Sequence, residues 1–458
     1  MRLLEDVLAD LGLPRAGRFD LTGDPRPAVL SSPLPVADCA IASVGACLGA
    51  AAELALARTG RLPEVTLDTG QVAAAMRAEF WLRDSAGRGV EGFAPLSRLW
   101  RTGAGWVRTH ANYPWHRAAL LAALDLADGP DDGVRPLVEH AMAQRAATEV
   151  EEVVYRAGGL AVAARSRAEW QAAAGAGVTS ASPLVAMAPL GVGAPARSGA
   201  AALPASGVRV LDLTRVIAGP VGTRMLAALG ADVLRIDDPR RPELPLHAVD
   251  GVIGKASAAV DLRTAAGGEL LHHLADQADV IVTGYRPGAL ARFGLEPEQI
   301  ADRHPGTIVA TLSAWGEAEG WTARRGFDSL VQIATGIGWA TSADGERPGS
   351  LPCQMLDHAA GYLLAAGVLE ALTRRARTGE STHVAVSLAR VAQWLLDQGP
   401  VTAVPPSSAA DAEAQADAFR TDLGGGWSGI SPPGRLDGRA LTWPHLPPTY
   451  GRARPGWD

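Results

Sequence analysis

One stretch of the chain, residues 208–293, constrains the fold more than any other. It opens with VRVLDL (208–213), an apolar, β-branched run that is typical of a buried strand. A helix with Pro220 in its first turn and Gly230 at its end follows, and ADVLRID (231–237) reads as the next strand. Strand, helix and strand in this order predict a parallel α/β unit. The first loop lacks G-x-G-x-x-G, so the sequence does not support a dinucleotide site there.

Two long Ala-rich helices are predicted elsewhere in the chain, and they look like copies of one another. Asp38 begins the first and Asp357 the second, and each lies 22 residues before the glycine of an identical Arg-Thr-Gly, which is Gly60 or Gly379. A short strand, VTLD or VAVS, follows in both cases. This repetition predicts a tandem arrangement of two partial copies, of which only the second has the α/β unit.

Composition and charge narrow the class of protein. A chain of 458 residues with a formal charge of −7 forms two or three domains and lacks the broad basic face of a general nucleic-acid binder. Its three cysteines have no metal-ligand spacing, which suits a reducing cytosol and predicts no metal site. No run of eighteen uncharged apolar residues occurs, and MRLLEDVLADLG does not read as a signal peptide, so we expect a cytoplasmic protein with no membrane partner.

Lys255 is the only lysine in the chain, where every other basic residue apart from histidine is an arginine. A bias that favours arginine wherever either residue serves explains most of this pattern. A lysine that remains against such a bias suggests a task that needs a compact, flexible point charge.

The α/β stretch closely resembles the opening of the family III CoA-transferases, the CaiB/BaiF family, which includes relatives of formyl-CoA transferase, carnitine CoA-transferase and α-methylacyl-CoA racemase. The resemblance continues through Lys255, YRPGALARFG (285–294) and RRGFDSLVQIATG (324–336) to MLDHAAG (355–361). It implies a Rossmann-like parallel-sheet domain that binds CoA, a smaller α+β linker domain, and a homodimer, which in this family is interlocked.

The resemblance implies that Asp357 is the catalytic nucleophile of a CoA-transferase. Its carboxylate would attack an acyl-CoA, pass through a mixed anhydride to an aspartyl-CoA thioester, and deliver CoA to a carboxylic acid. A simpler role is to cap the helix that Asp357 precedes, and the two roles are compatible. Asp38 has no α/β unit before it, so it reads as a relic, although a second site remains open.

The resemblance also implies a set of CoA contacts, with acyl-CoA as a substrate and no permanently bound cofactor. The expected contacts are Val216, Ile217, Arg240, Lys255, Gly284, Arg292, Arg325 and Phe327. Lys255 and Arg292 are expected near the phosphates, Arg240 is a looser match, and Gly284 stands where some relatives carry asparagine.

Two other functions stay open at this point. The racemases of this family carry a histidine base thirty residues before the aspartate, where this chain has Phe327, which cannot move a proton. This substitution disfavours a 2-methylacyl-CoA racemase or isomerase. A non-catalytic CoA-binding subunit is the third possibility, because the repeat is truncated. The acyl donor and acceptor cannot be read from the sequence.

The predicted organisation has five segments. They are a truncated first copy (1–94), a small α+β domain of the linker type (95–175), a linker rich in Ala, Gly, Pro and Ser (176–206), the Rossmann-like CoA-binding and catalytic domain (207–400) and a Pro/Gly-rich tail (401–458). How the partial repeats assemble is not evident from the sequence.

Overall fold

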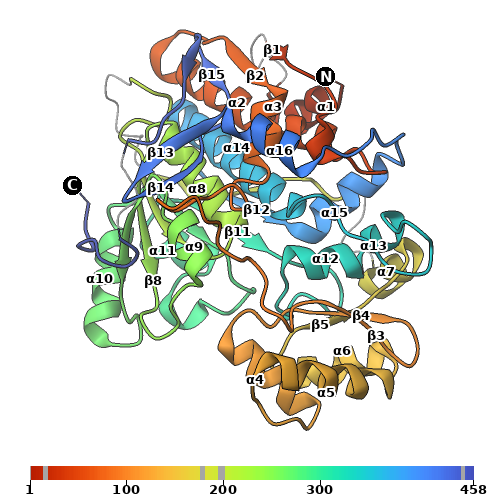
Figure 1. Cartoon of the computed structure of the whole chain (residues 1–458). Helices are drawn as coiled ribbons and strands as arrows, with labels where there is room; N and C mark the ends of the chain where they lie inside the picture. The colour runs from red at the N-terminus through yellow and green to blue at the C-terminus, as the bar shows by residue number, and fades with distance from the viewer. Residues whose placement is uncertain (1, 14–18, 176–180, 194–201, 445–448, 458) are drawn as a thin grey trace.

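A seven-stranded sheet forms the centre of the protein (Figure 1). The computed structural model describes residues 2–13, 19–175, 181–193, 202–444 and 449–457. The strand order is β6-β12-β11-β10-β7-β8-β9. The strands are β6 (Ala186–Val192), β7 (Arg209–Leu213), β8 (Asp232–Asp237), β9 (Ala256–Ala259), β10 (Val280–Thr283), β11 (Ile308–Ser313) and β12 (Glu380–Ser387). Six of them run parallel and β6 is antiparallel to β12, so the fold is mixed α/β around a largely parallel sheet.

The order of the parallel strands predicts where a ligand binds. Numbered 1 to 6 along the chain, β7 to β12 appear across the sheet as 3-2-1-4-5-6. The chain therefore reverses direction across the sheet between β7 and β10. Open α/β sheets bind ligands at the carboxyl ends of their strands, next to such a reversal.

Both faces of the sheet are covered by helices, as the apolar strand sequences require. In β10, Val280 and Val282 belong to the core that includes α8 (Ala218–Ala228) and α14 (Met355–Thr378). Ile281, between them, belongs to the core on the opposite face. The helices of that second face are α10 (Ala265–Ala275) and α11 (Pro297–Arg303).

The two predicted long helices are present and pack side by side, as Figure 1 shows for α2 (Val36–Thr59) and α14. They match in detail: both have 24 residues, both end at a left-handed glycine (Gly60 or Gly379), and a strand and a further helix follow each. The following elements are β2 (Val65–Asp68) and α3 (Thr69–Ala75) after α2, and β12 and α15 (Leu388–Asp397) after α14. Both helices are long and apolar enough to cross a membrane, but their apolar stretches are 89% and 100% buried within the protein, as expected for core helices.

Helices α8 and α14 cross at two glycines. A Cβ atom on Gly361 would lie 2.4 Å from the backbone oxygen of Ala218, and one on Gly222 would lie 2.7 Å from that of Gly361. Both distances are shorter than real Cβ contacts, and the obstructing atoms are backbone. The glycines therefore let α14 approach α8 closely enough to place the starts of both helices near the carboxyl edge of the sheet.

Gly361→Ala is expected to lower the free energy of unfolding by about 1–3 kcal/mol, because the two backbones must separate. Gly133→Ala is the matched control: Gly133 lies within helix α5 (Asp131–Ala143), and nothing stands within 4 Å of an added Cβ. The control should be neutral or stabilising by up to about 1 kcal/mol. Urea unfolding measures both. Equal stability of the two variants would contradict the close crossing.

A second, smaller layer lies apart from the large sheet, at the bottom of Figure 1. Its sheet has the antiparallel order β3-β4-β5, formed by β3 (Leu99–Arg101), β4 (Trp106–Thr109) and β5 (Ala161–Ala163). Three helices cover it: α4 (Pro114–Ala123), α5 and α6 (Ala147–Arg156). This region has its own hydrophobic core, and β3 and β4 form an antiparallel hairpin within it.

Two segments differ from the sequence interpretation. Within the predicted linker 176–206, the strand β6 adds an edge to the large sheet by pairing with β12, while residues 176–180 and 194–201 lie outside the described residues. The tail 401–458 forms the helix α16 (Ala409–Asp417) and a hairpin of β13 (Arg420–Gly424) and β14 (Trp427–Ile430). It also supplies β15 (Arg435–Leu436) and β16 (Arg439–Ala440), which join β1 (Phe19–Thr22) and β2 in one sheet.

Five further helices complete the described structure. They are α1 (Arg2–Asp10), α7 (Arg167–Ala174), α9 (Pro245–Asp250), α12 (Asp328–Ala334) and α13 (Ile337–Ala340). Of these, α12 stands between the small sheet and the start of α14, where the candidate site lies (Figure 1).

Candidate functional site

A cavity of about 470 Å³ opens at the carboxyl edge of the large sheet. All six parallel strands contribute a residue at or just beyond their carboxyl ends; these are Leu213, Asp237, Val260, Gly284, Ser313 and Leu388. The cavity is therefore where the strand order predicts a ligand.

Four arginines face this cavity without a carboxylate partner among the described residues; they are Arg241, Arg286, Arg292 and Arg325. Burial, together with the neighbouring charges of Arg286 and Arg241, lowers the pKa of Arg325 below its usual value. Like charges repel one another, so a cluster of unneutralised guanidinium groups favours a ligand with several negative charges. Phosphates meet this requirement.

Other arginines of the cavity are already paired. Arg240 lies 3.5 Å from Asp238 and 3.6 Å from Asp261. Arg215 contacts Glu243 at 3.2 Å. Two carboxylates thus partly neutralise Arg240, so it should bind an anionic ligand less strongly than its neighbour Arg241 does. The sequence interpretation did not include Arg241.

Arg325→Gln is expected to weaken CoA binding about 10-fold or more, because it removes a cation that no carboxylate in the described part of the chain neutralises. Arg240→Gln is the matched control, with a smaller loss, since Asp238 and Asp261 already share its charge. Calorimetric titration with CoA at two salt concentrations measures both affinities and should show a weaker salt dependence for Arg325→Gln. A greater loss in Arg240→Gln would contradict the electrostatic assignment.

Asp357 reaches the cavity from the first turn of α14 and is only 6% exposed. The prediction that it caps this helix is wrong: the cap position is Gln354, and its side chain makes no capping bond. The carboxylate of Asp328, the first residue of α12, instead accepts the backbone N–H of Asp357 at 3.0 Å. Asp38 occupies the same position in α2, where the cap position is Pro35, so it is not a cap either. Unlike Asp357, Asp38 is exposed to solvent.

Burial and two neighbouring carboxylates raise the pKa of Asp357 far above its usual range. The neighbours are Asp328 and Glu79. Burial also raises the pKa of Asp328, although its hydrogen bonds with the backbone of Asp357 and with Gln332 oppose the shift. Glu79 accepts a hydrogen bond from the ring of His358 at 2.8 Å. A carboxyl group in such surroundings is destabilised when ionised, and perturbed groups of this kind gather at functional sites.

The segment that follows β4 and the start of α4 supply one wall of the cavity, through Tyr113, Trp115 and His116. His110, which follows β4, stacks on Phe327 with ring centroids 3.9 Å apart. The hydroxyl of Tyr113 donates to Glu243, which lies in the α/β region. His116 stands edge-on to Phe327, and burial with nearby arginines lowers its pKa to about 4, so its ring is neutral at pH 7. Residues of the region around the small sheet and residues of the α/β region therefore line one cavity.

The first loop, between β7 and α8, has an unusual backbone. Val216 has φ = 68°, a left-handed conformation that a β-branched residue rarely adopts. Its N–H donates to the carboxylate of Glu243 at 3.2 Å. Strained residues of this kind concentrate at ligand-binding loops, and Val216 lines the cavity beside Ile217.

Lys255 does not line the cavity, which corrects its predicted place near the phosphates. Its side chain is fully buried, and its Nζ donates to Asp212 at 2.9 Å and to the backbone oxygen of Pro220 at 3.1 Å. Burial lowers its pKa to about 8, and the charge of Asp212 opposes that shift. Lys255 thus joins β9 to β7 and α8 from within the protein.

The structure brings the other predicted residues together. Asp357, Val216, Ile217, Arg240, Gly284, Arg292, Arg325 and Phe327 all line the one cavity. The sequence interpretation missed Tyr113, Trp115 and His116, although the aromatic run NYPWH after a strand offered a local signal. It also missed Arg241 and Arg286, which stand beside or within the motifs that it used. Among the described residues no three Cys, His, Asp or Glu side chains gather as a metal site requires.

Comparison with known proteins agrees with the sequence resemblance. Residues 205–424 match the sequence model of CoA-transferase family III. A probable fatty acyl-CoA transferase of Mycobacterium tuberculosis is 34% identical over 207 residues, 42% of this chain and 52% of its own length. An (R)-2-hydroxy-4-methylpentanoate CoA-transferase of Clostridioides difficile is 32% identical over 202 residues, 40% of this chain and 50% of its own. A crystal structure of a Mycobacterium tuberculosis hypothetical protein covers 43% of this chain and 58% of its own, at 35% identity and a TM-score of 0.41.

This chain is therefore similar, through residues 205–424, to CoA-transferase family III, and the predicted resemblance is confirmed for that part. It spans about half the length of the curated relatives it matches.

Proposed function

We propose that this protein is a CoA-transferase that moves CoA from an acyl-CoA to a carboxylic acid through an aspartyl-CoA thioester on Asp357. The observation that carries the proposal is the position of Asp357, a buried carboxyl group at the wall of a cavity lined by four arginines that pair with no carboxylate of the described residues. CoA carries a diphosphate and a 3′-phosphate, which match that cationic surface, and its thioester would extend toward Asp357.

The proposed reaction proceeds by acyl exchange. The ionised carboxylate of Asp357 attacks the thioester carbonyl, and the carbon–sulfur bond breaks to give a mixed anhydride and CoA thiolate. The thiolate then attacks the aspartyl carbonyl, which forms the aspartyl-CoA thioester and releases the donor acid. The acceptor carboxylate repeats both steps in reverse, so no oxidant or permanently bound cofactor is required.

The family relatives support the reaction class and leave the substrates open. Relatives are named as an (R)-2-hydroxy-4-methylpentanoate CoA-transferase, a succinate–glutarate CoA-transferase and a formyl-CoA:oxalate CoA-transferase. We propose an acyl-CoA and a small carboxylic acid as the substrates. We also propose a Rossmann-like CoA-binding domain (207–400) and a small domain of the linker type (95–175). The protein is proposed to be cytoplasmic and to form a homodimer. Light scattering, which measures the mass of the particle in solution, would test the dimer.

Incubation with a panel of acyl-CoAs and free acids in D₂O separates the candidate functions. A transferase produces a new CoA ester of the added acid, detectable by mass spectrometry. A racemase produces no new ester but incorporates deuterium at the α-carbon; Phe327, stacked on His110, disfavours this outcome. A CoA-binding subunit binds CoA with neither change, and that result would overturn the proposal.

A further inference from the structure

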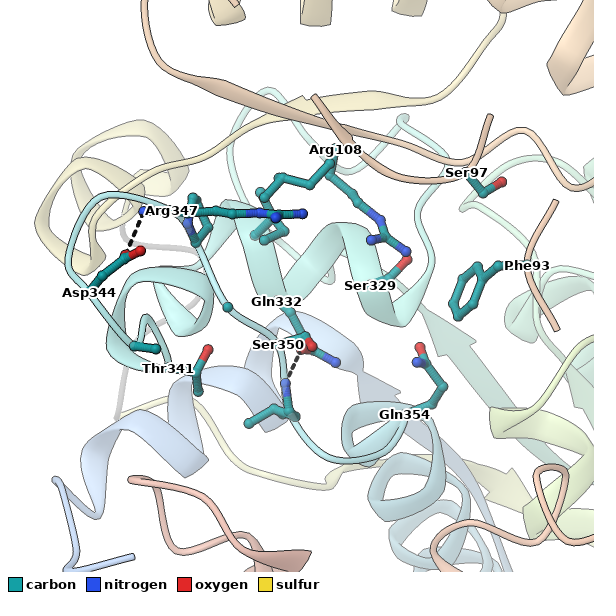
Figure 2. Close-up of a pocket in the computed structure, with 16 residues that line it drawn as sticks. Phe93, Ser97, Arg108, Ser329, Gln332, Thr341, Asp344, Arg347, Ser350 and Gln354 are labelled. Carbon is teal, nitrogen blue, oxygen red and sulfur yellow. Dashed lines mark hydrogen bonds between the residues drawn. The ribbon is translucent and has the colours of Figure 1, made fainter. Parts of the chain in front are cut away.

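A second cavity, of about 570 Å³, lies between the small sheet and the segment that connects α12 to α14. Figure 2 shows side chains that enter it from both sides, with Phe93 and Arg108 on one side and Ser329, Arg347 and Gln354 on the other. Its volume falls within the roughly 300–1,000 Å³ of small-molecule sites. Among the described residues, none lines both this cavity and the one at the carboxyl edge of the large sheet, to which we assign CoA. The second cavity is therefore a separate site.

Arg108 is the group in the second cavity that most needs a partner. Its side chain leaves β4 and points into the cavity (Figure 2). Its Nε atom is buried without a hydrogen-bond partner, and no carboxylate of the described residues forms an ion pair with it. Its guanidinium group lies over the ring of Phe93, 5.2 Å from the centroid. Burial lowers its pKa to about 10, so Arg108 remains a cation at pH 7. Burying an unpaired cation is costly, and a bound anion reduces that cost.

A second guanidinium group increases the positive charge of the cavity. Arg347 extends into it from the opposite side and forms no ion pair within the described part of the chain (Figure 2). One acidic residue, Asp344, belongs to the described lining. Its carboxylate accepts the backbone N–H groups of Glu346 and Arg347, at 2.8 and 3.0 Å, within its own turn. The cavity thus presents two cations and one anion that is already hydrogen-bonded.

The start of α14 and two neutral side chains add further donors. Gln354, the cap residue of α14, points its amide into the cavity and forms no capping bond (Figure 2). The N-terminal end of this 24-residue helix therefore lies at the cavity wall, and such an end favours negative charge. The hydroxyl of Ser329 is buried without a hydrogen-bond partner. Gln332 is different, because its amide already bonds to Asp328 and to the N–H of Leu351.

The charges of the cavity match a phosphate monoester better than a carboxylate. The positive end of a long helix acts as roughly half a unit charge, so with two guanidinium groups and one carboxylate the cavity has an excess of about 1.5 positive charges. A phosphate monoester carries about −1.5 to −2 at pH 7 and has three strong acceptor oxygens. A carboxylate, with one charge and two oxygens, would leave part of the positive charge and some of the donors unused.

The rest of the lining indicates an organic ligand. The apolar side chains of Leu99, Ile333 and Leu351 and the ring of Phe93 line the cavity beside the charged groups. An inorganic phosphate ion would leave this apolar surface in contact with water. Because burying apolar surface is favourable, a ligand with a carbon skeleton attached to the phosphate fits the cavity better than the bare ion.

We propose that the second cavity binds a small organic phosphate monoester, with the phosphate on Arg108 and Arg347 and the organic part against the apolar lining. Arg108 is the principal contact, since a guanidinium group binds a phosphate through two parallel hydrogen bonds, and Ser329 and Gln354 supply further donors. This inference does not depend on the proposed function and would hold if the protein transferred no CoA. CoA carries a phosphate monoester of its own, so the test must separate the two cavities.

Calorimetric titration with phenyl phosphate, without and with saturating CoA, tests the proposed site. We expect one molecule to bind to each chain when CoA is present, because CoA occupies the other cavity. Phenol, which lacks the phosphate, and benzoate, which has a single charge, should bind at least about 10-fold more weakly. Three results would overturn the proposal: no binding of phenyl phosphate, loss of its binding when CoA is added, or equally tight binding of benzoate.

Variants of the small sheet test the assigned contact. In the presence of CoA, Arg108→Gln should weaken the binding of phenyl phosphate about 10-fold or more, and Arg108→Lys should restore part of the affinity, because it keeps the charge without the paired donors. Arg101→Gln is the matched control, since Arg101 is an exposed residue of the neighbouring strand β3 that lines neither cavity. It should change nothing. Unchanged affinity in a folded Arg108→Gln would contradict the assignment.

Crystals grown with CoA and 4-bromophenyl phosphate would locate the ligand without relying on any variant. The anomalous signal of bromine should appear in the second cavity, beside Phe93 and Ile333. A bromine peak only in the other cavity or on the outer surface, or no peak at all, would overturn the proposal.

Discussion

Replacing Asp357 with asparagine is expected to lower the rate of CoA transfer by at least about 10³-fold, as the loss of a covalent nucleophile does in other enzymes. Asparagine keeps the size of the side chain and the hydrogen bond that the backbone N–H makes to Asp328, so the cavity should be preserved. CoA affinity should therefore change little. The measurement is the steady-state rate of CoA-ester formation, with CoA binding followed separately by calorimetry.

The chain contains its own control for this variant. Asp38 is the third residue of α2, as Asp357 is of α14, but it is exposed and lines neither cavity. Asp38→Asn should leave the transfer rate unchanged. A large loss in Asp38→Asn would mean that the first copy retains a working site, and an unchanged rate in Asp357→Asn would exclude the covalent mechanism.

Asp357→Asn is also expected to change how the free energy of unfolding depends on pH. Because the folded protein raises the pKa of Asp357, the folded state binds more protons than the unfolded state between the two pKa values. The contribution of this group to stability is thus fully present below its unfolded pKa and is lost as the pH rises through its folded pKa. Urea unfolding at pH 5 and pH 8 should show a larger loss in the wild type than in Asp357→Asn. An identical pH dependence would mean that Asp357 is not the destabilised group.

Lys255→Met is expected to lower the free energy of unfolding by about 3–5 kcal/mol, the usual effect of removing one partner from a buried ion pair. It leaves the carboxylate of Asp212 buried without its ion-pair partner, although it still accepts from the N–H and hydroxyl of Thr214 and the hydroxyl of Thr223. The double variant Asp212→Asn, Lys255→Met removes both charges and should recover much of the loss. Denaturant unfolding of the three proteins measures this coupling.

This experiment also distinguishes the two roles assigned to the lysine. A lysine that binds phosphate would show reduced CoA affinity with nearly unchanged stability when replaced. The buried pair with Asp212 predicts reduced stability in the single variant and near-normal CoA affinity in the folded double variant. The uniqueness of Lys255 in the sequence is then a consequence of packing: a compact ammonium group reaches Asp212 and the backbone of Pro220 together.

Local patterns were enough to predict the α/β unit. The apolar runs at 208–213 and 231–237 became β7 and β8, because residues such as Val210 and Leu211 pack on opposite faces of one sheet. The ends of the long helices at Gly60 and Gly379 were also predicted, since a left-handed residue that ends a helix favours glycine. These features depend on residues that are close together in the sequence, so the sequence alone is enough to predict them.

Features that depend on distant residues could not be predicted in this way. The N–H of Asp357, in the first turn of α14, donates to the carboxylate of Asp328, which lies 29 residues earlier in the chain. Tyr113 meets Glu243, 130 residues later. Whether an arginine is neutralised likewise depends on its tertiary neighbours, so Arg240 and Arg241 look alike in sequence although only Arg240 is paired. The strand β6 was missed because its composition resembles that of a linker and its pairing partner lies far along the chain.

The most direct test of the central claim is intact-protein mass spectrometry after incubation with a panel of acyl-CoAs, comparing the wild type with Asp357→Asn. Covalent transfer predicts an adduct with the mass of CoA or of the acyl group, which hydroxylamine removes and which the variant lacks. The acyl-CoA that forms it would identify the donor. If CoA binds measurably but no acyl-CoA leaves an adduct on the wild type, or if the same adduct forms on Asp357→Asn, then Asp357 is not the nucleophile of this protein.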